Sequence, residues 1–319
     1  MRPADLAPTV FSTVGLPTAR RVELWEAHNA NALIGLDVLA AEALEATELN
    51  VQLSQVHLAR VAGTAHVVSR SADVVARSPG DAIAVYLTLR GDAWFQHADG
   101  THRLRPGNAL ICETDQPFTR GFARGLEELV VKIPRAALPG VARLREPVIT
   151  TFDPRDQYAR ALAGMVGRAA RAERRLPAEE RILVDLVTVL ADRRAAPMAT
   201  AHRAAARAYI EEHLTDPGLG AGQVAAAIGI SERQLSRVFA ADGTSVPRHI
   251  LSRRLRLAYS VLSNGRGSVA DVAGRCGFTS VTYFSHAFRT HFGERASDIR
   301  LLVPAQNAGA GDRPLPPAR

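Results

Sequence analysis

The chain has 319 residues but only two cysteines, Cys112 and Cys276, and it has no Cys-x-x-Cys pair or Cys/His cluster. A disulfide framework or a structural zinc site is therefore not expected. No apolar run approaches the roughly 18 residues that a membrane span requires, and no signal-peptide pattern opens the chain. We expect a cytoplasmic protein without a membrane segment, and a hydrophobic content of 47% is enough for about two domains with cores of their own.

Lysine is almost absent, because Lys132 is the single one and arginine carries the remaining basic charge. The formal net charge is +7, and it is unevenly distributed. Residues 203–300 contain 13 arginines against 8 acidic residues, whereas residues 1–202 contain 24 basic and 23 acidic residues. An arginine-rich composition explains the choice of Arg over Lys but not this asymmetry. The basic excess in the C-terminal third favours binding to nucleic-acid phosphates.

The most informative pattern is a repeat within residues 219–300. Five residues of the first copy have counterparts 48 positions later: Val224, Ala225, Ile228, Gly229 and Ile230 correspond to Val272, Ala273, Cys276, Gly277 and Phe278. Two further residues, Leu235 and Phe239, recur 49 positions later as Phe284 and Phe288. The change from 48 to 49 predicts one extra residue in the second turn. A single copy would be a weak signal, but two copies with matching offsets are a strong one.

Each copy has the pattern of a helix-turn-helix. Apolar residues at helical spacing precede a glycine, which makes a turn with positive φ easy because it lacks a Cβ. Ser231 and Gln234 then have the spacing of a capping box, which starts a second helix. Leu235, Val238 and Phe239 form the buried face of that helix. Its outward positions are Arg233, Ser236 and Arg237, while Gln234 either faces outward or caps the helix.

A long helix is predicted between the two copies. Leu251, Leu255, Ala258 and Leu262 form one stripe at helical spacing, and Arg253, Arg254 and Arg256 are expected off that stripe. Asn264-Gly265 is expected to end the helix. Ser268 and Asp271 then have the capping-box spacing that opens the second copy. A rigid connector of this kind would hold the two units at a fixed separation.

Residues 203–300 resemble the DNA-binding domain of the AraC/XylS family of bacterial transcription regulators. The matching motif consists of Arg254-Leu255, Ala258, Leu262, Val272-Ala273, Gly277-Phe278, Phe284-Ser285, Phe288-Arg289, Phe292-Gly293 and Arg300. One position departs from the family, which usually has a proline where this chain has Ala296. The resemblance implies sequence-specific DNA binding by the second helix of each unit. The residues expected at the DNA are Arg233, Gln234, Ser236, Arg237, Val281, Thr282, Ser285 and His286, with Arg289 at a phosphate.

The N-terminal part reads as short strands. Strands are predicted at 83–89, 94–98, 101–105, 109–112 and 129–133, and Asp99-Gly100 is typical of a hairpin turn. Helices are predicted at 18–31, 153–172 and 178–194. Several short strands with turns about ten residues apart favour a β-sandwich or barrel.

About residues 20–195 resemble the cupin-like ligand-binding domain that precedes the DNA-binding domain in many AraC-family regulators. The resemblance depends on residues 103–110, on residues 131–135 and on the two helices that follow. It implies a small organic effector, and Tyr86, Trp94 and Phe95 are candidates to line its cavity, although aromatic strand residues are more often plain core. Metal is not expected, because His97 and His102 flank a hairpin and no His-x-His motif is present. Cys112 has no basic or acidic partner at a catalytic spacing.

We therefore expect an α+β protein. The predicted domains are 1–195, cupin-like, for sensing and dimerisation; 196–202, a linker; 203–301, two helix-turn-helix units joined by a long helix; and 302–319, a disordered tail. The apolar stripes in 153–194 either form a homodimer or cover the sheet of the same protomer.

The expected function is a transcription regulator that binds double-stranded promoter DNA and a small effector, without catalytic activity or cofactor, and that is compatible with contact to RNA polymerase. Two alternatives are a cupin enzyme fused to a basic module and a non-specific architectural DNA-binding protein. The enzyme would need a metal or nucleophile constellation that the sequence lacks. The architectural protein would show no preference among DNA sequences. A regulator binds its own site more tightly than other DNA, by roughly a thousandfold or more.

Overall fold

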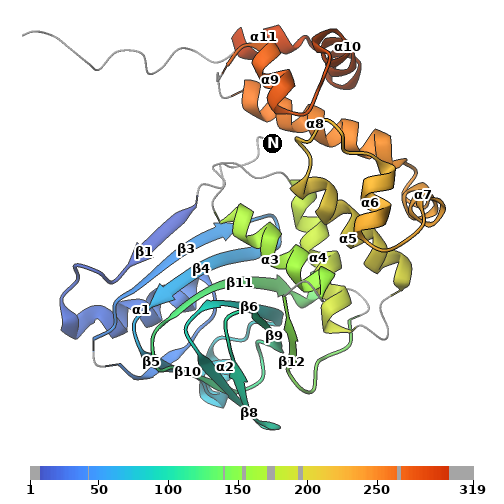
Figure 1. Ribbon diagram of the computed structural model, residues 1–319. Coiled ribbons are helices and arrows are strands. Elements are labelled where there is room, and N and C mark those ends of the chain that lie inside the picture. Colours follow the sequence, from blue (N-terminus) through green and yellow to red (C-terminus); the bar gives the residue numbers. More distant parts are fainter. Residues whose placement is uncertain are drawn as a thin grey trace, which may run out of the picture. The chain divides into compact units, whose positions relative to one another are not determined.

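The computed structural model describes residues 8–41, 43–138, 141–152, 156–170, 177–192, 197–263 and 267–301 (Figure 1). The chain divides into two compact units. The first contains Met1–Glu212 and Val224–Asp242, and the second contains His213–Gln223 and Gly243–Arg319. The predicted helix stop at Asn264-Gly265 and the predicted tail 302–319 lie outside the described residues.

Two antiparallel sheets make up most of the first unit (Figure 1). The larger sheet has the strand order β1 (Thr9–Ser12), β3 (Ala46–Gln52), β4 (His57–Gly63), β11 (Leu126–Pro134), β6 (Ala82–Arg90), β9 (Asn108–Glu113) and β12 (Val148–Thr151). The smaller sheet has the order β2 (Asp37–Ala40), β5 (His66–Arg70), β10 (Phe118–Phe122), β7 (Ala93–His97) and β8 (Gly100–Leu104). The predicted cupin-like sandwich is confirmed, and so is the hairpin at Asp99-Gly100, which joins β7 to β8.

Alternation along the strands separates two apolar cores. Residues such as Tyr86, Phe95 and Val130 point between the two sheets, where Trp25 of α1 (Thr18–Ala32) joins them. Their neighbours Val85 and Val131 point to the other face of the larger sheet, which is covered by helices. These are α3 (Gln157–Ala169), α4 (Pro177–Ala191) and α5 (Met198–Glu212). A short helix, α2 (Ala72–Arg77), follows β5 and is capped by Ser71.

The apolar stripes of α3 and α4 are buried within the protomer. Leu162, Met165 and Val166 of α3 pack in the same core as Leu183 and Leu186 of α4, and none of the five is more than 3% exposed. Of the two interpretations of these stripes, covering the sheet of the same protomer is what the structure shows. The stripes therefore no longer argue for a dimer.

Helix α5 continues this helical layer. It begins at Met198, so most of the predicted linker 196–202 is described as helix, and its residues Ala204 and Ala208 belong to the core of α3 and α4. Ion pairs extend the contact: Asp185 of α4 lies 3.7 Å from Arg203 and 3.9 Å from Arg207 of α5. Arg207 also donates to Asp242, which follows α7, over 2.8 Å.

The remaining helices form two pairs joined by a longer helix. α6 (Ala221–Ala227) and α7 (Glu232–Ala240) form the first predicted helix pair, and α9 (Val269–Arg275) and α10 (Val281–Phe292) form the second. Between them runs α8 (Val246–Leu262), and α11 (Ala296–Leu301) follows α10. In the second unit, the α8 residues Leu255, Ala258 and Leu262 pack against Phe284 and Phe288 of α10.

Arg253 of α8 lies off the leucine stripe, as the helical spacing predicts, but it is only 2% exposed. The helix also buries Val246 and Ile250, which lie with Arg253 on the side away from the leucines. Arg254 is partly buried, and its guanidinium donates to the carbonyl oxygens of Leu214 at 2.9 Å and Asp216 at 2.5 Å. No described helix has the length and apolar character that crossing a bilayer requires.

Candidate functional site

The two helix-turn-helix turns are closed by the same backbone hydrogen bonds. In the first turn Ile228, Gly229 and Ile230 donate to the carbonyls of Val224, Ala226 and Ala225 at 3.2, 3.3 and 3.1 Å. In the second turn Cys276, Gly277 and Phe278 donate to those of Val272, Gly274 and Ala273 at 3.0, 3.1 and 3.0 Å. Each bond has its counterpart 48 residues away. The predicted repeat is therefore a repeat of backbone geometry.

The glycine of each turn has the expected positive φ, which is 69° at Gly229 and 82° at Gly277. At Gly277 a side chain would also be crowded, since its Cβ would lie 2.9 Å from Arg254 and 3.1 Å from the carbonyl oxygen of Thr215. The helix α7 starts after Ser231 and α10 starts after Ser280, so the second turn is one residue longer. The extra residue predicted from the change in offset is confirmed.

Helix α7 presents a polar face. Arg233, Ser236 and Arg237 are exposed, while Leu235 and Phe239 are fully buried. Gln234 is held by a capping box, in which its backbone N–H donates to Ser231 Oγ and its side-chain oxygen accepts from the Ser231 N–H at 3.0 Å. Of the two roles open to Gln234, the structure therefore shows capping. The capping box of Ser268 and Asp271 at the start of α9 is confirmed as well.

Helix α10 presents a different face. Val281, Thr282, Ser285, His286 and Arg289 are all exposed, as the helical spacing predicted. Sequence analysis missed Tyr283, which is 55% exposed beside them. Tyr283 aligns with Gln234 at the 49-residue offset, so the alignment of the two copies could have indicated it. Arg289 lies in the last turn of this helix, away from the first-turn residues.

The three aromatic residues proposed for the effector do not share one surface. Tyr86 and Phe95 are both buried between the two sheets. Trp94 precedes Phe95 on β7 and therefore points to the opposite face of the smaller sheet. Its indole packs on the backbone of Gly121, the residue paired with it on β10, where a Cβ would lie only 2.2 Å from the ring. Only Tyr86 and Phe95 can face a ligand in the barrel interior.

Sequence analysis also missed a polar patch between the sheets, made of Glu48, Tyr86, Thr88, Arg120 and Glu128. Arg120 donates to both carboxylate oxygens of Glu128, at 3.0 and 2.7 Å, and its guanidinium carbon lies 3.9 Å from the centre of the Tyr86 ring. Glu48 is 0% exposed. Burial raises the pKa of Glu48 to about 7, against the lowering influence of Asn50 and with a further rise from Glu128.

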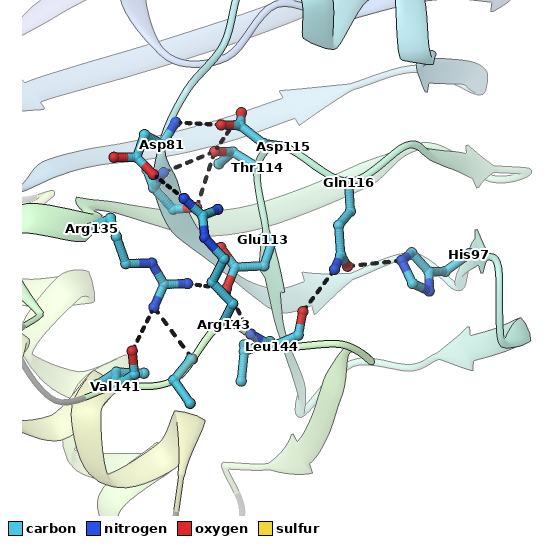
Figure 2. A network of polar contacts seen from close by, with 12 residues as sticks. Asp81, His97, Glu113, Thr114, Asp115, Gln116, Arg135, Val141, Arg143 and Leu144 are labelled. Atoms are coloured by element: carbon cyan, nitrogen blue, oxygen red, sulfur yellow. Dashed lines mark hydrogen bonds and ion pairs between the residues drawn. The ribbon is translucent and has the colours of Figure 1, made fainter.

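A second polar network lies at the other end of the strands (Figure 2). Glu113 accepts from Arg135 and from the backbone of Leu144, and Gln116 connects the carbonyl of Leu144 to His97 (Figure 2). Asp115 accepts the backbone N–H groups of Gly80 and Asp81 at 2.6 and 2.9 Å. Each carboxylate of this network already accepts hydrogen bonds or ion pairs from neighbouring segments. The network therefore attaches these loops to the barrel.

In the part of the chain that the structure describes, no group of three or more His, Cys, Asp or Glu residues could hold a metal ion. His97 and His102 instead both bond to Asp99, at 3.0 and 2.9 Å. His97 is largely buried rather than a surface residue, with a side chain 7% exposed. Burial raises the pKa of the Cys112 thiol to about 12, so this cysteine stays protonated.

Comparison with known proteins agrees with both halves of the molecule. The model of the AraC-binding-like domain matches residues 25–216, and the model of a helix-turn-helix domain matches residues 224–301. The chain is 26% identical over 253 residues to the transcriptional activator NphR of a Rhodococcus species, covering 74% of this chain and 75% of that protein. It is 35% identical over 127 residues to the transcriptional activator RhrA of Rhizobium meliloti, covering 38% and 40% of the two chains.

Among solved structures, the AraC-like transcriptional activator CuxR aligns with 80% of this chain and 96% of its own, at 19% identity and a TM-score of 0.48. The AraC-binding-like model alone accounts for more than half of the chain. Together with the repeated helix-turn-helix geometry and the two-sheet domain, it shows that the chain belongs to the AraC/XylS family of transcription regulators, DNA-binding proteins that respond to a small-molecule effector.

Proposed function

We propose that this regulator activates transcription by placing α7 and α10 in successive major-groove segments of promoter DNA, about ten base pairs apart on one face of the duplex. The observation that carries the proposal is the repeated turn, which presents two short helices with exposed polar faces. Activation is supported by the relatives NphR and RhrA, both of which are transcriptional activators. Contact to RNA polymerase is part of the proposal.

The two helices divide the recognition unequally. Arg233 and Arg237 of α7 can each pair with a guanine through two hydrogen bonds, which is worth about 1–3 kcal/mol of discrimination, and Ser236 lies between them. On α10, Val281 and Thr282 offer methyl groups to thymine, while Ser285 and His286 are weaker donors. Because Gln234 is already engaged in the capping box, we assign it to helix initiation. The α7 helix therefore supplies most of the specificity, and Arg289 contacts a phosphate.

Two variants test these roles on the intergenic DNA beside the gene. Arg237→Ala should relax base preference in one half of the footprint only, because it removes one base contact of about 1–3 kcal/mol. Arg289→Ala should weaken binding to all sequences alike and make the dependence of log K on log salt less steep by about one unit. Both residues are exposed, so both variants should fold. Equal, sequence-independent losses from the two substitutions would contradict the assignment.

For the effector, we infer a site between the two sheets, in contact with Tyr86 and Phe95 and without a metal. Support comes from the AraC-binding-like match and from the buried polar patch beside Tyr86. Trp94 is not part of this site, since it lies on the other face of β7. A metabolite screen by thermal shift on the full chain tests the inference. Metabolites that protect the wild type but not a Thr88→Val variant would support a site at this position.

A homodimer stays a prediction, and it depends on the resemblance alone. The apolar stripes that first suggested it, in residues 153–194, are buried in the protomer's own core, so a dimer would have to use other surfaces. Sedimentation velocity of the full chain at tens of micromolar gives the oligomeric state directly. A monomer at that concentration would contradict the prediction.

A further inference from the structure

Five buried polar atoms between the two sheets have no hydrogen-bond partner among the residues that the structure describes. They are both carboxylate oxygens of Glu48, Tyr86 Oη, Thr88 Oγ1 and Arg120 Nε. All four side chains are nearly inaccessible, with exposed fractions of 0 to 2%. A buried polar atom left unpaired costs about 1–3 kcal/mol, so such atoms are rare. Several of them in one barrel interior point to a partner that is itself polar.

Strand register brings these groups to one level of the barrel. Glu48 of β3 pairs with Val61 of β4, Val61 with Glu128 of β11, and Glu128 with Thr88 of β6. Adjacent strands lie about 4.8 Å apart, so the three steps from Glu48 to Thr88 cover roughly 14 Å of backbone. Tyr86 is the next residue of β6 on the same face. Arg120 reaches the row from the opposite sheet through its bonds to Glu128.

The charges of the patch do not balance. Both terminal nitrogens of the Arg120 guanidinium are bonded to Glu128, so Arg120 does not pair with Glu48. The nearest basic group is His28 of α1, whose Nε2 lies 3.6 Å from Glu48. Burial lowers the pKa of His28, and Asn50 lies 3.1 Å from the same nitrogen. A neutral His28 carries no charge toward Glu48. Ionised Glu48 therefore gives the patch one negative charge in excess.

We propose that the barrel interior binds a small organic cation, a protonated amine that also carries an oxygen acceptor. The ammonium group donates to the two free oxygens of Glu48. The acceptor oxygen faces the hydroxyl groups of Tyr86 and Thr88 and the Nε of Arg120. Phe95 and Phe122 provide apolar surface beside this patch. This inference depends on the proposed effector site between the sheets and specifies the chemical class of its ligand.

The test uses sets of molecules that differ only in the charged group. One set is 4-aminobutan-1-ol, 1,4-butanediol and 4-hydroxybutyrate, and another is 2-phenylethylamine, 2-phenylethanol and phenylacetate. Binding to the full chain is measured by calorimetry and thermal shift at pH 8. We expect an amine to bind at least tenfold more tightly than its alcohol or carboxylate counterpart. We also expect Glu48→Gln to abolish that preference, because the substitution keeps the shape and removes the charge.

The matched control is Glu127→Gln. Glu127 neighbours Glu128 on β11 but points to the other face and pairs with Arg60 and Arg90, so its loss should leave amine binding unchanged. An amine that binds Glu48→Gln as tightly as the wild type would overturn the proposal. Tighter binding of an alcohol or carboxylate that is lost in Thr88→Val would also overturn the cation class, while keeping the effector site. Binding of no member of either set would overturn the cation class, and the metabolite screen would then decide on the effector site.

Discussion

The two ends of the barrel contain polar clusters of opposite kinds. At the end where β6 begins, Glu113 and Asp115 accept hydrogen bonds from side chains and from the backbone (Figure 2). Toward the end where β6 finishes, Glu48 is as buried as Glu113, but neither of its oxygens has a hydrogen-bond partner among the described groups. Burial alone does not determine whether a carboxylate has hydrogen-bond donors. The difference lies in whether the fold itself supplies the donors.

The pKa values of Asp115 and Glu48 show the same contrast. Burial tends to raise the pKa of Asp115, but the backbone N–H groups of Gly80 and Asp81 and the Arg70 guanidinium lower it below its ordinary value. Burial raises the pKa of Glu48, and the lowering influence of the Asn50 side chain does not offset it. The cluster of Figure 2 is complete without a ligand, apart from the Nε of Arg135. A cluster that lacks donors is where a ligand can add the most binding energy.

The largest effect that separates the two ends should come from Arg70. This side chain is 0% exposed, and it donates to the carbonyls of Thr114, Gly35 and Ser78 at 2.5, 2.8 and 2.6 Å. Arg70→Ala leaves two buried carbonyls and the half-buried carbonyl of Ser78 without this donor and a hole in the core, so the free energy of unfolding should fall by about 3–5 kcal/mol. Urea denaturation measures it. A loss below about 1 kcal/mol would show that hydrogen bonds do not hold this end together.

A smaller effect is expected for Glu48→Gln, which should raise the free energy of unfolding at alkaline pH rather than lower it. The folded carboxyl has a pKa of about 7 against an ordinary value of 4.5, so the folded chain keeps a proton that the unfolded chain has lost. The wild type should therefore lose stability as pH rises through this window, by on the order of 3 kcal/mol in total, while the variant should not.

Thermal melts of both proteins at pH 5, 6, 7 and 8 provide the measurement. His57 and His66 also titrate with lowered pKa values, but they are present in both chains and cancel in the difference. His28, whose Nε2 lies 3.6 Å from Glu48, has a lowered pKa too, and its response to the substitution is part of the measured difference. Parallel pH profiles for wild type and variant would show that Glu48 finds donors in the folded protein. The contrast between the two ends would then disappear.

The smallest effect is expected for Arg143→Ala. Arg143 pairs with Asp81 at 2.9 Å at the edge of the Figure 2 network, but both side chains are more than 60% exposed. Solvent screens such a pair, so its removal should cost no more than about 0.5 kcal/mol. The same urea experiment serves as the readout. A loss as large as that of Arg70→Ala would mean that the network depends on its outer ion pairs.

The repeat was the most predictable part of the structure, because its evidence is local. A helix cap, a glycine turn and a buried stripe all lie within about 20 residues of each other, and each has a sequence signature. The strands around Asp99-Gly100 were predictable for the same reason. Strand β10 was not predicted, since Gly121 interrupts its short run of alternating residues.

The polar patch could not be predicted, because it depends on pairing between strands far apart in sequence. Glu48 and Thr88 come to one level only through the registers of β3, β4, β11 and β6. The grouping of Trp94 with Phe95 had a different cause. Consecutive residues of a strand point to opposite faces, so period-two alternation alone was enough to separate them.

The turn of the helix-turn-helix separates the structural residues from the residues that we propose read DNA. Its closing bonds join backbone groups, and the proposed readout positions Arg233, Ser236 and Arg237 lie outside the core of Leu235 and Phe239. The chain already carries two versions of this unit, one with arginines outward and one with valine, threonine and histidine. New outward residues can therefore be selected at little cost in folding energy, and a regulator of this design can acquire new promoters while its core residues stay fixed.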